Sequence, residues 1–164
     1  MMNSEDFQAD VDTRKEYLTF TLGVEQYGVD ILKVKEIRGW ENLREMHDVP
    51  EYIVGVLDFR GSIVPIVDLR LRFGVEKIEY TPTTVIIVLT TDQDDMMGIV
   101  VDAVSDVLGV KNSDIKPSPN MGSKIKTDYI LGMVSKEEGM IMLVDSSRLV
   151  NIEDLEVPEN SLAG

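Results

Sequence analysis

The sequence predicts an all-β protein made of two small β-barrels packed against each other. Short strand-like runs follow one another closely and are separated by Gly, Pro and Asp turns, a pattern typical of barrels and sandwiches. The strand pattern also occurs twice along the chain. Finally, the runs Ile63–Val67 and Val85–Leu89 are apolar at nearly every position, so both faces of these strands must be covered. Packing one copy against the other would cover them.

The clearest repeat is a predicted hairpin. The run Y-I-V-G-V from Tyr52 returns as Y-I-L-G-M from Tyr129, and both hairpins end at an aspartate. An upstream segment, Gly28–Ile37, matches Gly98–Val107 at an offset of 70 positions. A duplicated unit in which the second connecting loop is longer explains the difference between the two offsets. Three residue pairs lie 77 positions apart: Tyr52/Tyr129, Gly55/Gly132 and Asp68/Asp145.

The first copy spans about residues 16–80. Residues 1–15 are polar and acidic, and we expect them to form a flexible tail. Residues 17–22 alternate apolar and polar side chains, which predicts a strand, and a second strand begins near Gly28. Ile31, Val34 and Ile37 are spaced by three, closer to a helical period, so the local structure remains open there. After an irregular link, the hairpin turns at Gly61, where a two-residue turn requires positive φ.

The second copy spans about residues 81–155. It opens with the strand at 85–89, continues with a strand near Ile99, and then has a long polar loop over 109–127. The second hairpin follows. Asp145 is a predicted N-cap for a short C-terminal helix that runs to about Leu155. Residues 156–164 are expected to form a second flexible tail. The boundary near residue 80 is approximate, because strands can be exchanged between the barrels.

The bulk composition excludes several functional classes. Of the 164 residues, 16 are basic and 30 acidic, which gives a net charge of −14 and opposes binding to nucleic acid or to an anionic membrane. The chain has no cysteine, so disulfides and thiolate metal sites are excluded. No apolar run is long enough to span a bilayer, and the N-terminus carries no secretory signal pattern. We therefore expect a soluble, cytoplasmic protein.

Catalytic and metal-binding patterns are missing from the sequence. His47 is the only histidine and lies in a polar link, which indicates a surface residue. No glycine-rich nucleotide-binding motif is present. The acidic cluster Asp92–Asp95 fails the test for a calcium loop, since Met97 and Ala103 occupy the positions that need Gly and a carboxylate. We expect no enzymatic activity, no metal and no cofactor.

Arg60 is the most informative single residue. It lies at the tip of the first hairpin, whereas the second hairpin carries Glu137-Glu138 at its tip. A purely structural turn gives no reason for this reversal of charge. An arginine beside exposed aliphatic side chains suits hydrogen bonding to a partner protein. An ordinary surface arginine is the alternative.

Several segments together resemble the CheW family of chemotaxis coupling proteins. They are Y-L-T-F-T-L-G, Y-G-V-D-I-L-K-V-K-E-I-R-G, G-V-L-D-F-R-G-S-I-V-P-I-V-D-L-R and G-I-V-V-D-A-V-S-D-V-L, in this order within about residues 16–150. The resemblance implies two five-stranded barrels related to SH3 and OB folds. It also implies a non-enzymatic adaptor that links methyl-accepting chemoreceptors to the histidine kinase CheA, recruited from the cytoplasm to membrane-bound receptor arrays.

The resemblance also implies two binding surfaces. The helical hairpin tip of the receptor would lie in an apolar groove between the barrels, with Arg60 at its flank and Gly55 nearby. A core role for Ile31, Val34 and Ile37 is the alternative. The regulatory domain of the kinase would dock on another face of the first barrel, approximately around Trp40, Met46 and Val49. The groove residues carried over by position are Leu18, Ile31, Val34, Ile37, Val104 and Ser105.

Two related readings stay open. The chain could be the regulatory domain of a CheA-type kinase, although no kinase motif is present. It could also be a CheW-like adaptor of a chemosensory pathway other than chemotaxis. One departure from the family pattern bears on receptor preference: Asp58-Phe59 stands where Asn-Leu is commoner before Arg-Gly.

Overall fold

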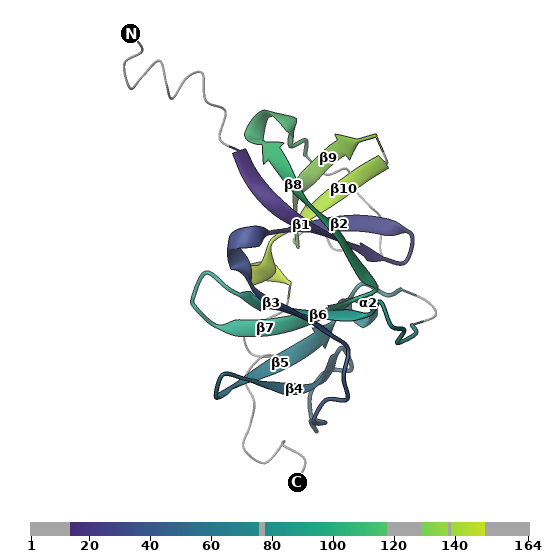
Figure 1. The fold of residues 1–164 in the computed structure, drawn as a ribbon, viewed down its shortest axis with the longest axis vertical. Helices are drawn as coiled ribbons and strands as arrows, with labels where there is room; N and C mark the ends of the chain where they lie inside the picture. The colour runs from purple at the N-terminus through teal and green to yellow at the C-terminus, as the bar shows by residue number, and fades with distance from the viewer. Residues whose placement is uncertain (1–13, 76–77, 118–128, 138, 150–164) are drawn as a thin grey trace.

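The computed structural model describes residues 14–75, 78–117, 129–137 and 139–149. Ten strands and a single turn of α-helix, α2, make up most of this part of the chain, with short 3-10 turns between them (Figure 1). The predicted all-β class is confirmed. The elements are β1 (Arg14–Leu22), β2 (Glu25–Asp30), η1 (Ile31–Lys33), β3 (Val34–Gly39), β4 (Ile53–Phe59), β5 (Ser62–Asp68), α2 (Leu69–Arg72), β6 (Val85–Thr90), β7 (Met96–Val101), β8 (Ala103–Lys111), η2 (Asn112–Asp114), β9 (Ile130–Lys136), β10 (Gly139–Val144) and η4 (Ser146–Arg148).

The strands form two five-stranded sheets that exchange hairpins. Sheet A has the order β8-β1-β2-β10-β9, and sheet B has the order β3-β6-β7-β5-β4. Sheet A therefore combines β1 and β2 of the first repeat with β8, β9 and β10 of the second. Sheet B combines β6 and β7 of the second repeat with β3, β4 and β5 of the first. The two orders become identical when β1–β5 are exchanged for β6–β10. The sequence boundary near residue 80 separates the repeats and does not coincide with a boundary between the sheets.

The repeated tyrosines and aspartates have the same task in both sheets. The backbone N–H of Asp68 donates to the carbonyl of Tyr52 at 2.7 Å, and the N–H of Asp145 donates to that of Tyr129 at 2.9 Å. Each aspartate side chain then caps the next short helix, by accepting from the N–H of Arg70 or of Ser147. These bonds fix where each hairpin ends and the chain turns.

The repeated glycines allow a close approach between neighbouring segments. A Cβ on Gly55 would lie 2.6 Å from the carbonyl oxygen of Arg44, and one on Gly132 would lie 2.8 Å from that of Lys116. Isolated bridges from Arg44 to Val56 and from Lys116 to Met133 run beside these contacts. In each sheet, the segment that precedes the hairpin thus packs over the first strand of that hairpin, β4 or β9.

One apolar cluster is shared by the two sheets. It includes Leu18, Phe20 and Tyr27 from sheet A and Ile87, Leu89 and Ile99 from sheet B, all of them buried. This packing covers the apolar outer faces that the sequence predicted. Each sheet also has a smaller cluster of its own. The Arg72 guanidinium lies 4.8 Å from the ring centres of both Tyr52 and Tyr129, the equivalent tyrosines of the two repeats.

Two ambiguous segments are resolved by the structure. Ile31–Lys33 forms a 3-10 turn capped by Asp30, and β3 begins at Val34, so the three-residue spacing arises from a turn that runs into a strand. At the other end, Asp145 is an N-cap as predicted, but the helix described is a 3-10 turn, Ser146–Arg148. The expected continuation to Leu155 and both expected tails lie outside the described residues, except for the start of β1 at Arg14.

Candidate functional site

Four of the eight residues predicted to bind the receptor meet at the shared core. Leu18 belongs to the buried cluster and is 5% exposed. Ile31, Val34 and Val104 are half-buried and pack against the same cluster. Sheet register explains part of this arrangement, because Val104 on β8 lies opposite Phe20 on β1. These side chains form the edge of the core where η1 and β8 flank it.

Ile37 and Ser105 lie further out. Val34 lies opposite Leu89 and Ile37 lies opposite Ile87, with a bulge between Val34 and Glu36, so both side chains are on the face of β3 that borders the shared core, but Ile37 is 41% exposed. Ser105 is exposed on β8. Val107, opposite Leu18, is 43% exposed and was not predicted from the sequence. Strand alternation over Ser105–Val107 was the signal that could have identified it. The predicted row of Ile31, Val34 and Ile37 thus borders the shared core, and its exposure increases toward Ile37.

Gly55 and Arg60 lie on a different part of the fold. Gly55 is buried under the backbone of Arg44, so its own contacts are structural. Arg60 is exposed in the turn between β4 and β5, with φ of 53°, and Gly61 follows with φ of 84°. These angles match the two-residue hairpin turn predicted at this point. The structure joins neither residue to the cluster around Leu18.

The tip around Arg60 is well defined. The side chain of Asp58 accepts from the N–H of Gly61 at 3.0 Å, and the Arg60 guanidinium lies 4.9 Å from the ring centre of Phe59. Positive φ is uncommon for arginine and is unfavourable for any residue with a Cβ. An exposed arginine held in this conformation is a candidate contact residue. The β4–β5 and β9–β10 hairpins lie at opposite ends of the molecule (Figure 1).

The three residues predicted to bind the kinase fall into two groups. Met46 and Val49 are half-buried against the shared core. Trp40 packs against the smaller cluster of sheet B and stacks on Tyr80, with ring centres 4.1 Å apart and planes 17° apart. Tyr80 is 46% exposed and was not predicted as a surface residue. The stacked pair places a half-buried indole and an exposed phenol ring beside the first part of the 39–51 link.

Beneath this aromatic pair lies a buried ionic network centred on Arg70. Its Nε and Nη2 donate to the two carboxylate oxygens of Asp68, each at 2.9 Å. Its Nη1 donates to Asp102 at 3.0 Å and to the carbonyl of Glu79 at 2.7 Å. Tyr80 completes the network by donating its hydroxyl to Asp68 at 3.1 Å. Burial opposes the charge on Arg70, but the hydrogen bonds to the two aspartates outweigh it and raise its pKa.

Asp102 extends this network to the other sheet. It lies between β7 of sheet B and β8 of sheet A, and its second carboxylate oxygen accepts from the N–H of Gly23 at 2.7 Å. At the position that the repeat makes equivalent, the contact between the two sheets is more exposed to solvent. There Ser147 accepts from the N–H of Asp92, and Lys33 donates to Asp92 at 2.6 Å in a solvent-exposed ion pair. That hydrogen bond lowers the pKa of Asp92 and raises the pKa of Lys33.

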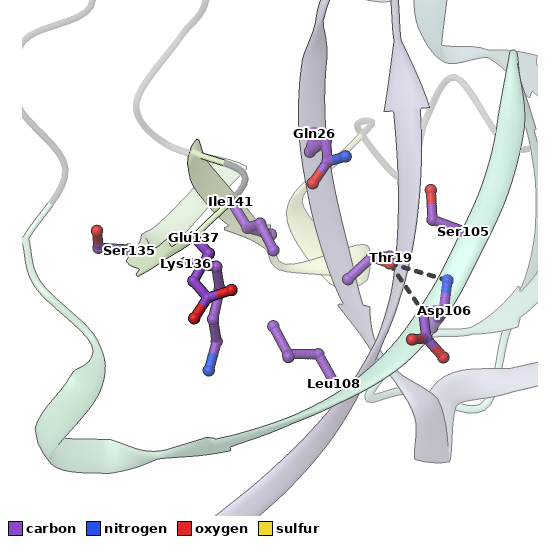
Figure 2. A pocket seen from close by; sticks show the side chains of 9 residues that line it. All are labelled: Thr19, Gln26, Ser105, Asp106, Leu108, Ser135, Lys136, Glu137 and Ile141. Atoms are coloured by element: carbon purple, nitrogen blue, oxygen red, sulfur yellow. Dashed lines mark hydrogen bonds between the residues drawn. The ribbon is translucent and has the colours of Figure 1, made fainter.

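A separate cavity of about 690 Å³ opens between β8 and β9, the two edge strands of sheet A (Figure 2). Thr19 at its base is buried, and its hydroxyl exchanges hydrogen bonds with the backbone of Asp106. Within the described part of the chain, no group of three acidic or histidine side chains is arranged to hold a metal ion. The cavity is lined by Thr19, Gln26, Ser105, Asp106, Leu108, Ser135, Lys136, Glu137 and Ile141.

Comparison with known proteins gives consistent matches over most of the chain. A family model described as a CheW-like domain matches residues 16–154. Chemotaxis protein CheW of Klebsiella aerogenes is 43% identical over 146 residues, covering 89% of this chain and 87% of the relative. Chemotaxis protein CheW of Rhizobium meliloti is 37% identical, covering 87% and 91%. The crystal structure of the scaffolding protein TtCheW from Thermoanaerobacter tengcongensis matches with a TM-score of 0.79 at 29% identity, covering 89% of this chain and all of that one.

Proposed function

Because the chain belongs to the CheW-like family, we propose that it is a non-enzymatic adaptor of chemotaxis signalling that couples methyl-accepting chemoreceptors to a CheA-type histidine kinase. The observation that carries this proposal is the family match over residues 16–154, together with exposed apolar residues at the core edge where the receptor surface is expected. The relatives named above are chemotaxis proteins, which favours this function over a kinase regulatory domain or a non-chemotactic adaptor.

The receptor-binding surface is proposed to combine the core edge with the nearby open positions. Val34 and Val104 offer partly covered apolar surface, and Ile37 on β3 and Val107 on β8 offer exposed apolar side chains. An apolar helix face buries well against such a surface. We include Arg60 as a separate polar contact, because its guanidinium is exposed at the tip of the β4–β5 hairpin. The proposed set remains Leu18, Ile31, Val34, Ile37, Gly55, Arg60, Val104 and Ser105.

The kinase-binding surface is proposed to centre on Trp40. The Trp40–Tyr80 stack offers a partly exposed aromatic pair, the kind of side chain that contributes most binding energy at protein interfaces. Met46 and Val49 support the segment that follows by packing on the core. No helix in the described residues is long and apolar enough to cross a bilayer. We propose that the chain reaches the membrane-bound array through its receptor contacts.

The deciding experiment is reconstitution with separate partners. A soluble receptor cytoplasmic hairpin and a CheA regulatory domain are each titrated against the chain, and kinase activity is then measured with all components present. The proposal expects binding to both partners and receptor-dependent kinase activity only in the complete mixture. Binding to neither partner would refute it.

Paired substitutions test the receptor surface itself. Ile37→Asp should weaken binding of the receptor hairpin by roughly 1–3 kcal/mol without loss of stability, because this side chain is already exposed. Val24→Asp is the matched control, since Val24 is 96% exposed in the β1–β2 turn, outside the proposed surface. Equal receptor affinity of the two variants would place the receptor elsewhere.

A further inference from the structure

The internal repeat allows the two sheets to be compared position by position. Thr19 lies opposite Gly28 in sheet A, and Val88 lies opposite Gly98 in sheet B, so these positions are equivalent. In the same way, Lys136 opposite Gly139 corresponds to Phe59 opposite Ser62. The cavity between β8 and β9 therefore has a counterpart between β3 and β4.

In sheet B this counterpart is filled by the chain itself. Phe59 is only 5% exposed and belongs to one apolar cluster with Val64 and Val88, against which Met96 also packs. The ring is supplied by the tip of the β4–β5 hairpin, and Arg60 beside it lies over the same ring. An aromatic side chain next to a cation thus closes the opening of sheet B.

In sheet A no described side chain fills the same opening. Lys136 replaces Phe59, Thr19 replaces Val88 and Gln26 corresponds to Met96, while Ile141 keeps the apolar character of Val64. Figure 2 shows the four side chains of sheet A around an open space that Leu108 also borders. The missing ring accounts for a cavity where the other sheet has packed side chains.

The charges around the two openings differ as well. In sheet B, Arg38 pairs with Glu36 beside the opening. The equivalent pair in sheet A is Leu108 and Asp106, so the carboxylate is kept and its cationic partner on the same strand is lost, while Lys136 contributes an ammonium group to the cavity lining. Glu137 adds a second carboxylate at the rim. Among the described residues, neither Asp106 nor Glu137 takes part in an ion pair. A cation brought from outside would give Asp106 the ion pair that Glu36 has in sheet B.

We propose that this cavity binds a loop of a partner protein whose tip carries an aromatic side chain next to an arginine or lysine. The ring takes the place that Phe59 has in sheet B, and the cation lies beside Asp106 and Glu137. A second copy of this chain cannot supply its own Phe59, because that ring is buried in sheet B. The inference stands apart from the proposed receptor and kinase surfaces, although Ser105 links the cavity to the receptor side.

The test uses a cyclic peptide with the sequence of residues 57–63, L-D-F-R-G-S-I, as the probe. Its binding to the full chain is measured by amide chemical shifts in NMR and by fluorescence polarisation. We expect shifts at Asp106 and Lys136, and at least tenfold weaker binding when the peptide's Phe is replaced by Ala, because burying a phenyl ring favours binding by that factor or more. A peptide with Arg replaced by Ala should bind more weakly and lose its salt dependence.

Substitution in the protein gives an independent check. Lys136→Phe should fill the cavity from within, as Phe59 does in sheet B, and should reduce peptide binding at least tenfold while raising the melting temperature. Lys136→Ala is the control and should keep binding. Absence of shifts at millimolar peptide, or equal binding of the Phe and Ala peptides, would overturn the proposal. The peptide comparison needs only the native chain, so it decides the question even if Lys136→Phe does not fold.

Discussion

Replacing Arg70 by Met should destabilise the protein more than any surface substitution. The Arg70 side chain is 1% exposed and makes two hydrogen bonds to Asp68, one to Asp102 and one to the carbonyl of Glu79. Met has a similar length but no charge, so the fully buried carboxylate of Asp68 would lose its partner cation. Breaking a buried ion pair from one side costs about 3–5 kcal/mol. For a chain of this size that corresponds to a fall in melting temperature of roughly 6–20 °C.

Urea unfolding followed by fluorescence would measure this loss directly. Trp40 is the only tryptophan and stacks on Tyr80, which in turn lies against Arg70, so its emission reports on the same region. Arg148→Met is the control, because that arginine is 68% exposed and its ion pair should contribute less than about 1 kcal/mol. Combining Arg70→Met with Asp68→Asn should recover part of the loss, since the orphaned charge is removed.

A loss of less than about 1 kcal/mol for Arg70→Met, with an unchanged denaturant dependence, would contradict a structural role for the Arg70–Asp68 pair. Such a result would mean that solvent or a neighbouring side chain compensates the Asp68 carboxylate. It would also mean that Arg70 does not hold the crossover at Asp102 in place.

Three other predictions concern the receptor contact, packing and pH. Arg60→Ala should leave the melting temperature within about 2 °C of the native value and weaken receptor binding roughly 5- to 150-fold by calorimetry; unchanged affinity would remove Arg60 from the interface. Gly55→Ala should lower the free energy of unfolding by about 1–3 kcal/mol, because the added Cβ would meet the carbonyl of Arg44. Gly39→Ala is the control and should be nearly neutral, because the space around Gly39 is open. Equal effects in chemical unfolding would contradict the packing argument. Burial, with the charge of Glu25 adding to it, raises the pKa of Tyr27 to about 12 from 10.0, so the folded state favours the neutral phenol. Its contribution of about 2–3 kcal/mol is therefore complete below pH 10 and lost as the pH rises through 12, and Tyr27→Phe should reduce this alkaline loss in stability measurements between pH 9 and 12.

The sequence predicted the repeated hairpins well because their signals are local. The turn at Arg60-Gly61 and the equivalent pairs of tyrosine, glycine and aspartate all reappear with the same roles. The exchange of hairpins between the sheets could not be predicted from these residues alone. β1–β2 and β6–β7 are equivalent repeat segments, so each can complete either sheet as far as strand pattern is concerned. Only the long-range packing of the whole chain selects the pairing observed.

The binding surfaces were predicted less completely. The spacing of Ile31, Val34 and Ile37 indicated a single apolar row, and the bulge between Val34 and Glu36 keeps Val34 and Ile37 on the same face of β3, but the spacing did not reveal that Ile37 is the more exposed of the two. The buried position of Arg70 was also missed, because arginine is normally exposed and nothing next to it in the sequence reveals Asp102 as a partner. The open cavity in sheet A depends on a comparison of the two repeats that only the strand register makes possible.

The exchanged hairpins have a consequence for the origin of this fold. A single repeat, expressed alone, could complete a five-stranded sheet either with its own first hairpin or with that of a second identical chain. In the second case each chain would lend its first hairpin to the other and accept the same hairpin in return. The two halves of this protein stand in that relation to each other. The fold is therefore that of a hairpin-swapped homodimer whose subunits have been fused, and the fusion left each half free to diverge into a different surface.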